Sequence, residues 1–146
     1  MSDRERKSYI VVGDSFEYDP ETLRYLASNL NDPYVYVVFR EVVRFRAYGL
    51  MKSYLADYAY RRRRYDNAFL VLEATKFIER VEEWNTHKYY LTVRGTQLVD
   101  YLLNDLGIDK EQFRMITPDE YQQALKKSYQ PEPEMPHIIT TKEVED

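Results

Sequence analysis

The stretch from Leu72 to Gly95 constrains the fold of this chain more than any other. It begins with LEATKFIER, continues through a polar turn expected at residues 85–87, and ends with KYYLTVRG. Apolar and aromatic residues on both sides of a short polar turn favour two antiparallel strands. Thr92 directly precedes a segment with helical spacing, and a threonine there caps a helix N-terminus well. The sequence therefore predicts the order helix, strand, turn, strand, helix.

Two further segments lead into this unit: LAD at residues 55–57 and a run of four arginines at 61–64. Taken together with LExxxFIER and LTxxG, they resemble the winged helix-turn-helix domain of MarR-like and PadR-like transcription regulators. The resemblance implies a mainly α fold with a small β-hairpin and extra N- and C-terminal helices. It also implies binding to double-stranded DNA as a homodimer, with a recognition helix over residues 61–75 in the major groove.

A second resemblance rests on Trp84 and the strand KYYLTVRG that follows it. They are similar to the winged helix of plectin and of a eukaryotic small-subunit ribosomal protein, which contacts RNA, the ribosome or another protein. The predicted hairpin carries Glu79, Glu82 and Glu83, whereas hairpins that contact DNA usually carry arginine or lysine. Both interpretations stay open at this point.

The resemblance to regulators also suggests which residues contact DNA. Arginine has forked donors that suit phosphates and guanine edges, and asparagine can pair with adenine. The predicted DNA-binding residues are the four arginines, one asparagine one turn later, one lysine before the helix, and two residues of the hairpin: Arg61, Arg62, Arg63, Arg64, Asn67, Lys52, His87 and Lys88.

The charge distribution supports a local basic surface in an acidic protein. The net charge is −4 in the 146-residue chain, but residues 40–64 hold eight basic and two acidic side chains. Binding to a polyanion depends on the local field more than on the total charge. We therefore interpret residues 40–64 as a nucleic-acid-binding footprint.

Composition places the chain among soluble globular proteins. It is 44% hydrophobic and 32% charged, and it lacks an apolar run of about 18 residues. The N-terminal apolar stretch is too short for a signal peptide, so we expect a cytoplasmic protein with no membrane contact. The absence of cysteine excludes disulfides and thiolate chemistry.

The segments before the arginines are predicted in order. Residues 8–16 form a short strand that ends in a turn, and residues 19–30 form a helix that begins Asp-Pro. Residues 34–48 follow a second Asp-Pro pair, Asp32-Pro33, and favour a second helix, although YVYVVF alone would suit a strand. Residues 50–60 are expected to be the first helix of the helix-turn-helix.

The segments after the hairpin supply helices and a tail. Thr117-Pro118-Asp119-Glu120 predicts a capping box, with Tyr121 and Leu125 of the following helix facing inward. The predicted organisation is an N-terminal segment at 1–18, a winged helix-turn-helix domain at 19–107, C-terminal helices at 108–130 and an acidic extended tail at 131–146. Dimerisation is expected through the helix at 19–30, the helix at 118–129, or both.

Signals for catalysis, metals and cofactors are weak. His87 and His137 are too far apart in sequence to form a typical ligand pair. Gly13-Asp14-Ser15 is similar to a block of lipase-like serine esterases, but neither histidine has an aspartate three residues before it. The chain also lacks a glycine-rich phosphate loop. The sequence therefore predicts a protein that is not an enzyme and has no cofactor.

Overall fold

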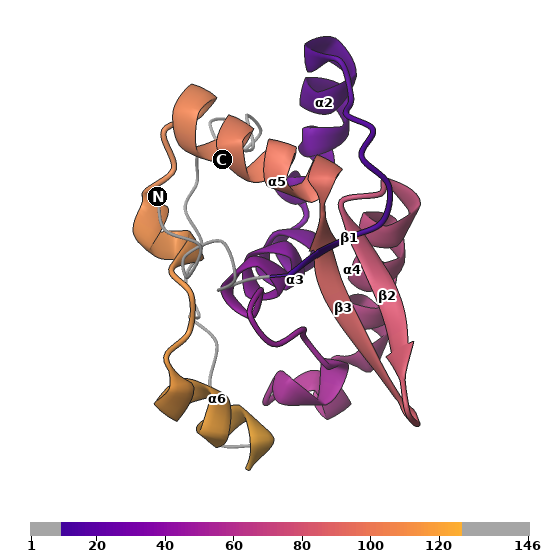
Figure 1. The fold of residues 1–146 in the computed structure, drawn as a ribbon, viewed down its shortest axis with the longest axis vertical. Helices are drawn as coiled ribbons and strands as arrows, with labels where there is room; N and C mark the ends of the chain where they lie inside the picture. Colours follow the sequence, from indigo (N-terminus) through magenta and orange to yellow (C-terminus); the bar gives the residue numbers. More distant parts are fainter. Residues whose placement is uncertain (1–9, 127–146) are drawn as a thin grey trace.

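A computed structural model of the protein describes residues 10–126. The predicted tail at 131–146 lies outside these residues, as does the beginning of the N-terminal segment. Five α-helices and a three-stranded mixed sheet make up the described part, so the prediction of a mainly α fold with a small hairpin is confirmed. Figure 1 shows the strands beside α3 and α4, with α2 at one end and α6 at the other.

The first two helices begin where the Asp-Pro pairs predict. Helix α2 spans Pro20–Ala27 and continues as the 3-10 turn η1 over Ser28–Asn31, and α3 spans Pro33–Arg44. The Asp32 carboxylate accepts hydrogen bonds from the amides of Tyr34 and Val35, which caps α3. The helical interpretation of this segment is confirmed, and α3 is buried along most of its length.

The predicted helix at 50–60 is wrong. Leu50 instead pairs with Tyr89 in an antiparallel bridge, and the two residues exchange both backbone hydrogen bonds, at 3.0 and 2.8 Å. Gly49 has a φ of +86°, and the Tyr90 ring occupies the space that a side chain at this position would need. The glycine therefore makes the pairing of the next residue with β3 possible. Two 3-10 turns follow in place of the helix: η2 at Lys52–Tyr54 and η3 at Tyr58–Tyr60.

Helix α4 and the two strands of the hairpin follow in the predicted order. Helix α4 spans Arg62–Ala74, strand β2 spans Ile78–Glu83 and strand β3 spans Thr86–Thr92. Tyr65, Ala68, Phe69 and Leu72 form the buried face of α4.

The hairpin turn differs from the prediction. Glu83 pairs with Thr86, so the turn consists of Trp84 and Asn85, while Thr86 and His87 belong to β3. Strand β1, at Val11–Val12, adds parallel to β3 and gives the sheet order β1-β3-β2. The predicted short strand at 8–16 is confirmed in these two residues.

The chain after the hairpin packs back on α3. Helix α5 spans Val93–Asp100 and continues as a π-helical turn, η4, over Tyr101–Asp105. The predicted cap is confirmed, since the Thr92 hydroxyl accepts from the Gly95 amide at 2.9 Å. The 3-10 turn η5 over Lys110–Phe113 then leads to the last described helix.

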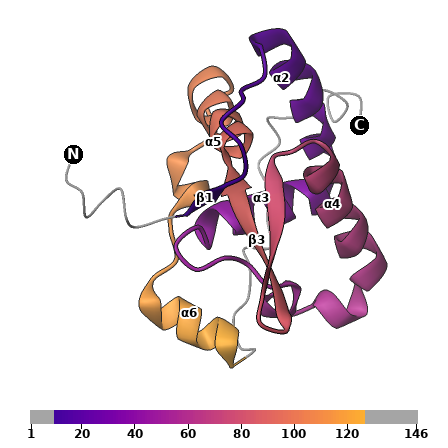
Figure 2. The ribbon, with the colours of Figure 1, turned by 45° about the vertical axis from the view of Figure 1, so that its right-hand side comes forward.

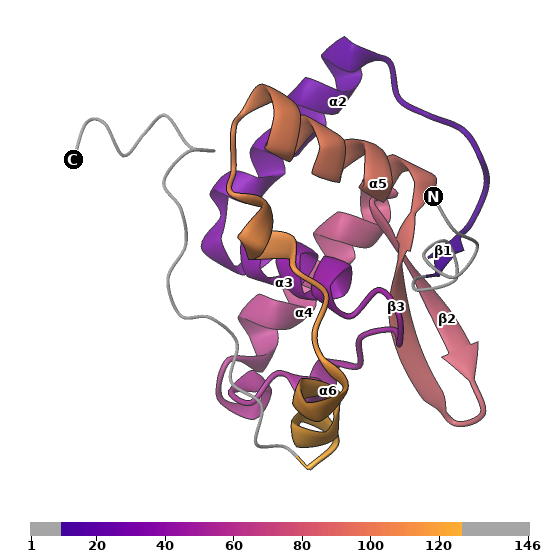
Figure 3. The same ribbon diagram turned by 60° about the vertical axis from the view of Figure 1, so that its left-hand side comes forward.

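Helix α6, at Pro118–Leu125, begins with the predicted capping box. The Tyr121 ring stacks on Tyr48 with centroids 3.9 Å apart, which fixes α6 against the segment after α3 (Figure 3). Ala124 is buried and Leu125 is 47% exposed, so the prediction that Leu125 faces inward is wrong. None of the helices in the described part of the chain has the length and apolar character that a membrane crossing requires.

Candidate nucleic-acid interface

Four arginines stand at the beginning of α4: Arg61, Arg62, Arg63 and Arg64, here called the α4 arginine cluster. All four are exposed. No side chain caps the helix N-terminus, and its first turn contains no acidic residue. A helix N-terminus carries partial positive charge and favours anions, so four cations there raise the local potential instead of neutralising it.

Tyrosines from two other segments lie against this cluster. Arg61 donates from Nη1 to the Tyr34 hydroxyl at 2.8 Å, and the Arg64 guanidinium lies 5.5 Å from the centre of the Tyr34 ring. The Arg62 guanidinium lies 5.7 Å from the centre of the Tyr58 ring. The hydrogen bond to Tyr34 raises the pKa of Arg61 above its ordinary value. These contacts place Arg61, Arg62 and Arg64 against tyrosine side chains while leaving them charged and accessible.

The carboxylates near the cluster are already engaged. Asp57 pairs with Arg61 at 3.3 Å and accepts from the Tyr65 hydroxyl at 2.9 Å. Asp66 accepts from the Lys52 ammonium at 2.8 Å and from the Tyr58 hydroxyl at 2.6 Å. Desolvation raises the pKa of Asp66, but these two hydrogen bonds outweigh it and the net pKa is lowered. Lys52, predicted to contact DNA, is therefore held in an internal ion pair.

A hollow of about 400 Å³ separates α4 from the start of α3. It is lined by residues of the two helix beginnings: Asp32, Pro33, Tyr34, Arg63, Arg64 and Asn67. Arg63 and Asn67 are one turn apart and thus share a face of α4. The structure brings these two predicted DNA-binding residues together at one concave surface.

The two predicted residues of the hairpin have neighbours of their own. His87 Nε2 lies 3.8 Å from the Glu82 carboxylate, its cross-strand partner. The Lys88 ammonium donates to the Tyr48 backbone carbonyl at 3.2 Å and is half-buried. No hydrogen bond or ion pair joins either residue to the α4 arginine cluster within residues 10–126. Figure 2 shows the hairpin tip and the start of α4 at the same end of the molecule.

The basic block at 40–64 is not one surface. Arg40 and Arg44 are only 1% and 8% exposed and pair with the buried Glu41, at 3.0 and 3.7 Å. Counting charge along the sequence could not separate these internal ions from the exposed ones. The signal that could have done so is the position of Arg40, Glu41 and Arg44 inside an otherwise apolar helix.

Two aromatic residues at this end have an exposure that the sequence did not predict. Tyr60, directly before the arginines, is 89% exposed, and Trp84 at the hairpin tip is 96% exposed. Trp84 has a backbone φ of 56°, which residues other than glycine rarely adopt. The spacing of apolar residues could not predict the exposure of Trp84, because a turn residue follows neither strand nor helix spacing.

Comparisons with protein-family models, with curated proteins and with solved structures each find no match to this chain. Among the described residues, no group of three or more histidine or acidic side chains could hold a metal ion.

Proposed function

We propose that the protein binds double-stranded DNA as a transcription regulator, with the first turns of α4 in the major groove. The observation that carries the proposal is the charge state of this surface. Arg62, Arg63 and Arg64 are exposed and make no ion pair with any carboxylate in residues 10–126. Three accessible guanidinium groups at a helix N-terminus lower their free energy when an anion binds, and duplex DNA presents a dense row of phosphates.

The geometry suggests different contacts with DNA for different residues of α4. Arg63 and Asn67 line one hollow and share the outward face, so they are the residues proposed to reach base edges. Arg62 and Arg64 lie on either side over tyrosine rings and are proposed to contact phosphates. Phosphate contacts position a protein on the duplex, whereas base contacts select the sequence.

The winged-helix arrangement is part of the same proposal. It is supported by the order α3, the Leu50 bridge, the two 3-10 turns, α4 and the hairpin. Through its bridge to Tyr89, Leu50 places a further short extended segment beside β3. This segment precedes the two 3-10 turns that lead into α4. Phe69 of α4 packs on Tyr89 with ring centroids 4.5 Å apart, so the hairpin and the proposed recognition helix are held together.

We also propose that the protein acts as a homodimer. Tyr25 on α2 is 76% exposed and Leu70 on α4 is 64% exposed, so both offer apolar surface to a partner. Helix α6 is less suited, because Tyr121 and Ala124 already pack within the chain. Sedimentation velocity tests this: a species that stays monomeric over a tenfold rise from micromolar concentration contradicts it.

The second candidate function is a module that binds RNA, the ribosome or a protein. The observation in its favour is Trp84, fully exposed at the tip of a hairpin whose first strand holds three glutamates. An acidic strand repels phosphates, and an exposed tryptophan is typical of a binding hot spot on a protein surface. Its prediction is that partner binding depends on Trp84 and not on Arg62 or Arg63.

The test is the salt dependence of binding to a labelled DNA duplex, measured by fluorescence anisotropy. Each phosphate contact contributes about 0.9 to the slope of log affinity against log salt. Arg62→Ala combined with Arg64→Ala, the two proposed phosphate contacts, should weaken binding to all sequences and flatten that slope by about 1 to 2. The matched control removes two exposed cations elsewhere, Arg24→Ala with Lys126→Ala, and should change neither. Absence of salt-dependent binding by the wild type, or a preference for RNA over the duplex, contradicts the proposal.

A further inference from the structure

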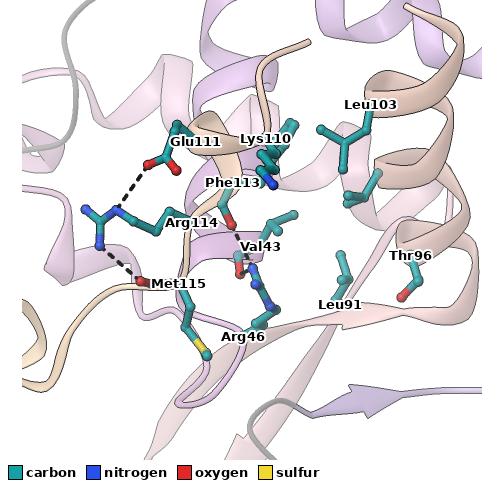
Figure 4. A pocket seen from close by; sticks show the side chains of 11 residues that line it. Val43, Arg46, Leu91, Thr96, Leu103, Lys110, Glu111, Phe113, Arg114 and Met115 are labelled. Atoms are coloured by element: carbon teal, nitrogen blue, oxygen red, sulfur yellow. Dashed lines mark hydrogen bonds and ion pairs between the residues drawn. The ribbon is translucent and has the colours of Figure 1, made fainter. Parts of the chain in front are cut away.

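A second concave site lies on another part of the molecule, between the end of α3, strand β3, helix α5 and the turn η5. It has a volume of about 450 Å³. Figure 4 shows its side chains converging from these four elements on one space. It shares no residue with the hollow beside the α4 arginine cluster.

The walls of this cavity are mainly apolar. They are formed by six side chains, of which Val43, Leu91 and Phe113 are buried and the others half-buried: Val43, Leu91, Val99, Leu103, Phe113 and Met115. A cavity of this size with few polar groups has the properties of a site for a small organic molecule. Because its walls come from segments far apart in the sequence, the packing of η5 on α3 creates it.

One side of the cavity carries an excess of positive charge. Arg46, Lys110 and Arg114 line it, against the single carboxylate of Glu111. Arg46 Nη1 donates to the backbone carbonyls of Val43 and Phe113, both at 2.8 Å. These bonds hold the guanidinium between the end of α3 and the turn η5, in the wall of the cavity (Figure 4).

Lys110 differs from the other two cations. The Arg114 guanidinium pairs with Glu111 at 3.9 Å and with Glu120 at 3.4 Å. The Lys110 ammonium, by contrast, has no hydrogen bond or ion pair within the described part of the chain. It is exposed at the margin of an apolar cavity, where an anionic group of a ligand would meet it.

We propose that this cavity binds a small amphipathic anion, with an apolar body among Val43, Leu91 and Leu103 and a single anionic group at Lys110. This choice of ligand depends on two features of the site, its apolar walls and its excess of cations. Apolar walls favour any hydrophobic molecule, and the excess of cations selects among them for one that carries a carboxylate, sulfonate or phosphate. The proposal stands independently of DNA binding, since no residue is shared.

The experiment uses two fluorescent probes with nearly the same aromatic skeleton. The anion 8-anilinonaphthalene-1-sulfonate and the neutral N-phenyl-1-naphthylamine both brighten in apolar surroundings, but only the first carries a charge. Titration of the folded protein should give saturable 1:1 binding of the anion, about five- to tenfold tighter than the neutral probe, because a charge-assisted contact adds to the same apolar burial.

Two variants locate the binding. Lys110→Gln is an exposed substitution that should leave folding intact, lower affinity for the sulfonate about fivefold and leave the neutral probe unchanged. Leu103→Trp fills the cavity and should abolish binding of both probes, with circular dichroism confirming the fold. The matched control, Lys126→Gln, removes a lysine that does not line the cavity and should change neither affinity.

Three results would overturn the proposal. Equal affinity of the two probes would show that the cations do not take part. An unchanged sulfonate affinity in Lys110→Gln would place the anionic group elsewhere. Probe fluorescence that rises only as urea loosens the protein would show binding to partly unfolded chains instead of to this cavity.

Discussion

The Lys52 ammonium lies 2.8 Å from the Asp66 carboxylate and joins the segment before α4 to α4 itself. The same ammonium lies 5.3 Å from the centre of the Phe69 ring and 5.9 Å from that of Tyr89. One cation therefore touches the 3-10 region, the proposed recognition helix and the hairpin. The Lys52 side chain thereby fixes these three elements relative to one another.

The first prediction concerns this pair. The folded-state pKa of Asp66 is lowered, so its contribution to stability is present above the ordinary aspartate pKa of about 4 and is lost as pH falls through the folded-state value. Asp66→Asn should lower the free energy of unfolding by about 0.5–1 kcal/mol at pH 7, because the pair is partly exposed to solvent. Urea unfolding at pH 7 and below pH 4 measures this.

The difference between wild type and Asp66→Asn should shrink at the acidic pH. Asp105→Asn is the control, since this exposed carboxylate has no ion pair among the described residues, and its effect should be small at both pH values. A constant difference between wild type and Asp66→Asn across the pH range would show that the carboxylate charge does not stabilise the fold.

Local capping chemistry accounts for the part of the fold that the sequence predicts well. Asp19, Asp32, Thr92 and Thr117 each accept from backbone amides two or three residues further on, so the residues that start a helix lie beside it in the sequence. The predicted start of α4 near Arg61 is also close to the observed one. These features need no knowledge of the tertiary structure.

The sequence fails to predict the structure where a residue's conformation or contacts depend on partners far away in the sequence. Leu50 pairs with Tyr89, a residue far along the chain, and this pairing outweighs the helical spacing of residues 50–60. Lys52 pairs with Asp66 of α4, and the spacing of residues along the chain could not show this contact either. Of the candidate site, the sequence predicted the exposed arginines and Asn67, but not the tyrosines that support them.

The second prediction separates base reading from phosphate contact on α4. Asn67 is exposed and lines the hollow with Arg63 and Arg64. Under the proposed function, Asn67→Ala should change which duplex sequence is preferred, with a loss of about 1–3 kcal/mol at the best site and an unchanged salt slope. Selection from a random-duplex pool, run in parallel for wild type and variant, measures it. Identical preferred sequences would show that Asn67 reads no base.

The third prediction concerns the hairpin tip. Trp84 has a φ of 56° and is 96% exposed, so it bears a backbone cost without gaining burial. Trp84→Gly should raise the free energy of unfolding by about 0.5–1 kcal/mol, because glycine adopts positive φ freely in a two-residue hairpin turn. Thermal unfolding of wild type and variant tests this, and a fall in stability would mean that the indole contributes contacts.

The single tryptophan also reports on function by its fluorescence. If DNA binds through α4 alone, acrylamide should quench Trp84 equally with and without duplex, since glutamates line the adjacent strand. Protection of Trp84 by a bound partner would instead favour the second candidate function.

The fourth prediction tests the junction between the hairpin and α5. A Cβ atom at Gly95 would clash with the Phe77 carbonyl oxygen and lie 2.6 Å from Leu91 Cδ1. Gly95→Ala should therefore cost about 1–3 kcal/mol or more through overpacking against backbone that cannot move aside easily. Thr96→Ala on the same turn should cost much less. Equal melting temperatures for Gly95→Ala and wild type would contradict this packing.

The fifth prediction concerns the buried charges of α3. Arg40 Nε lies 3.0 Å from Glu41 Oε2, and the two side chains are 1% and 0% exposed. Arg44 contacts the same carboxylate at 3.7 Å and reaches Glu120 of α6 at 3.5 Å. Removing one member of a buried ion pair leaves an uncompensated charge, so Glu41→Gln should cost about 3–5 kcal/mol.

Replacing both partners removes the charge that would otherwise be stranded. The double variant Arg40→Met with Glu41→Leu should therefore be destabilised less than Glu41→Gln alone, because apolar side chains of similar size are close to neutral in such positions. Arg44 keeps Glu120 and its hydrogen bond to the Arg114 carbonyl at 3.0 Å in that variant. Chemical denaturation of the three proteins measures the order. If the double variant is the less stable, the pair contributes net attraction beyond the cost of its desolvation, and the arginines of α3 stabilise the fold by their charge.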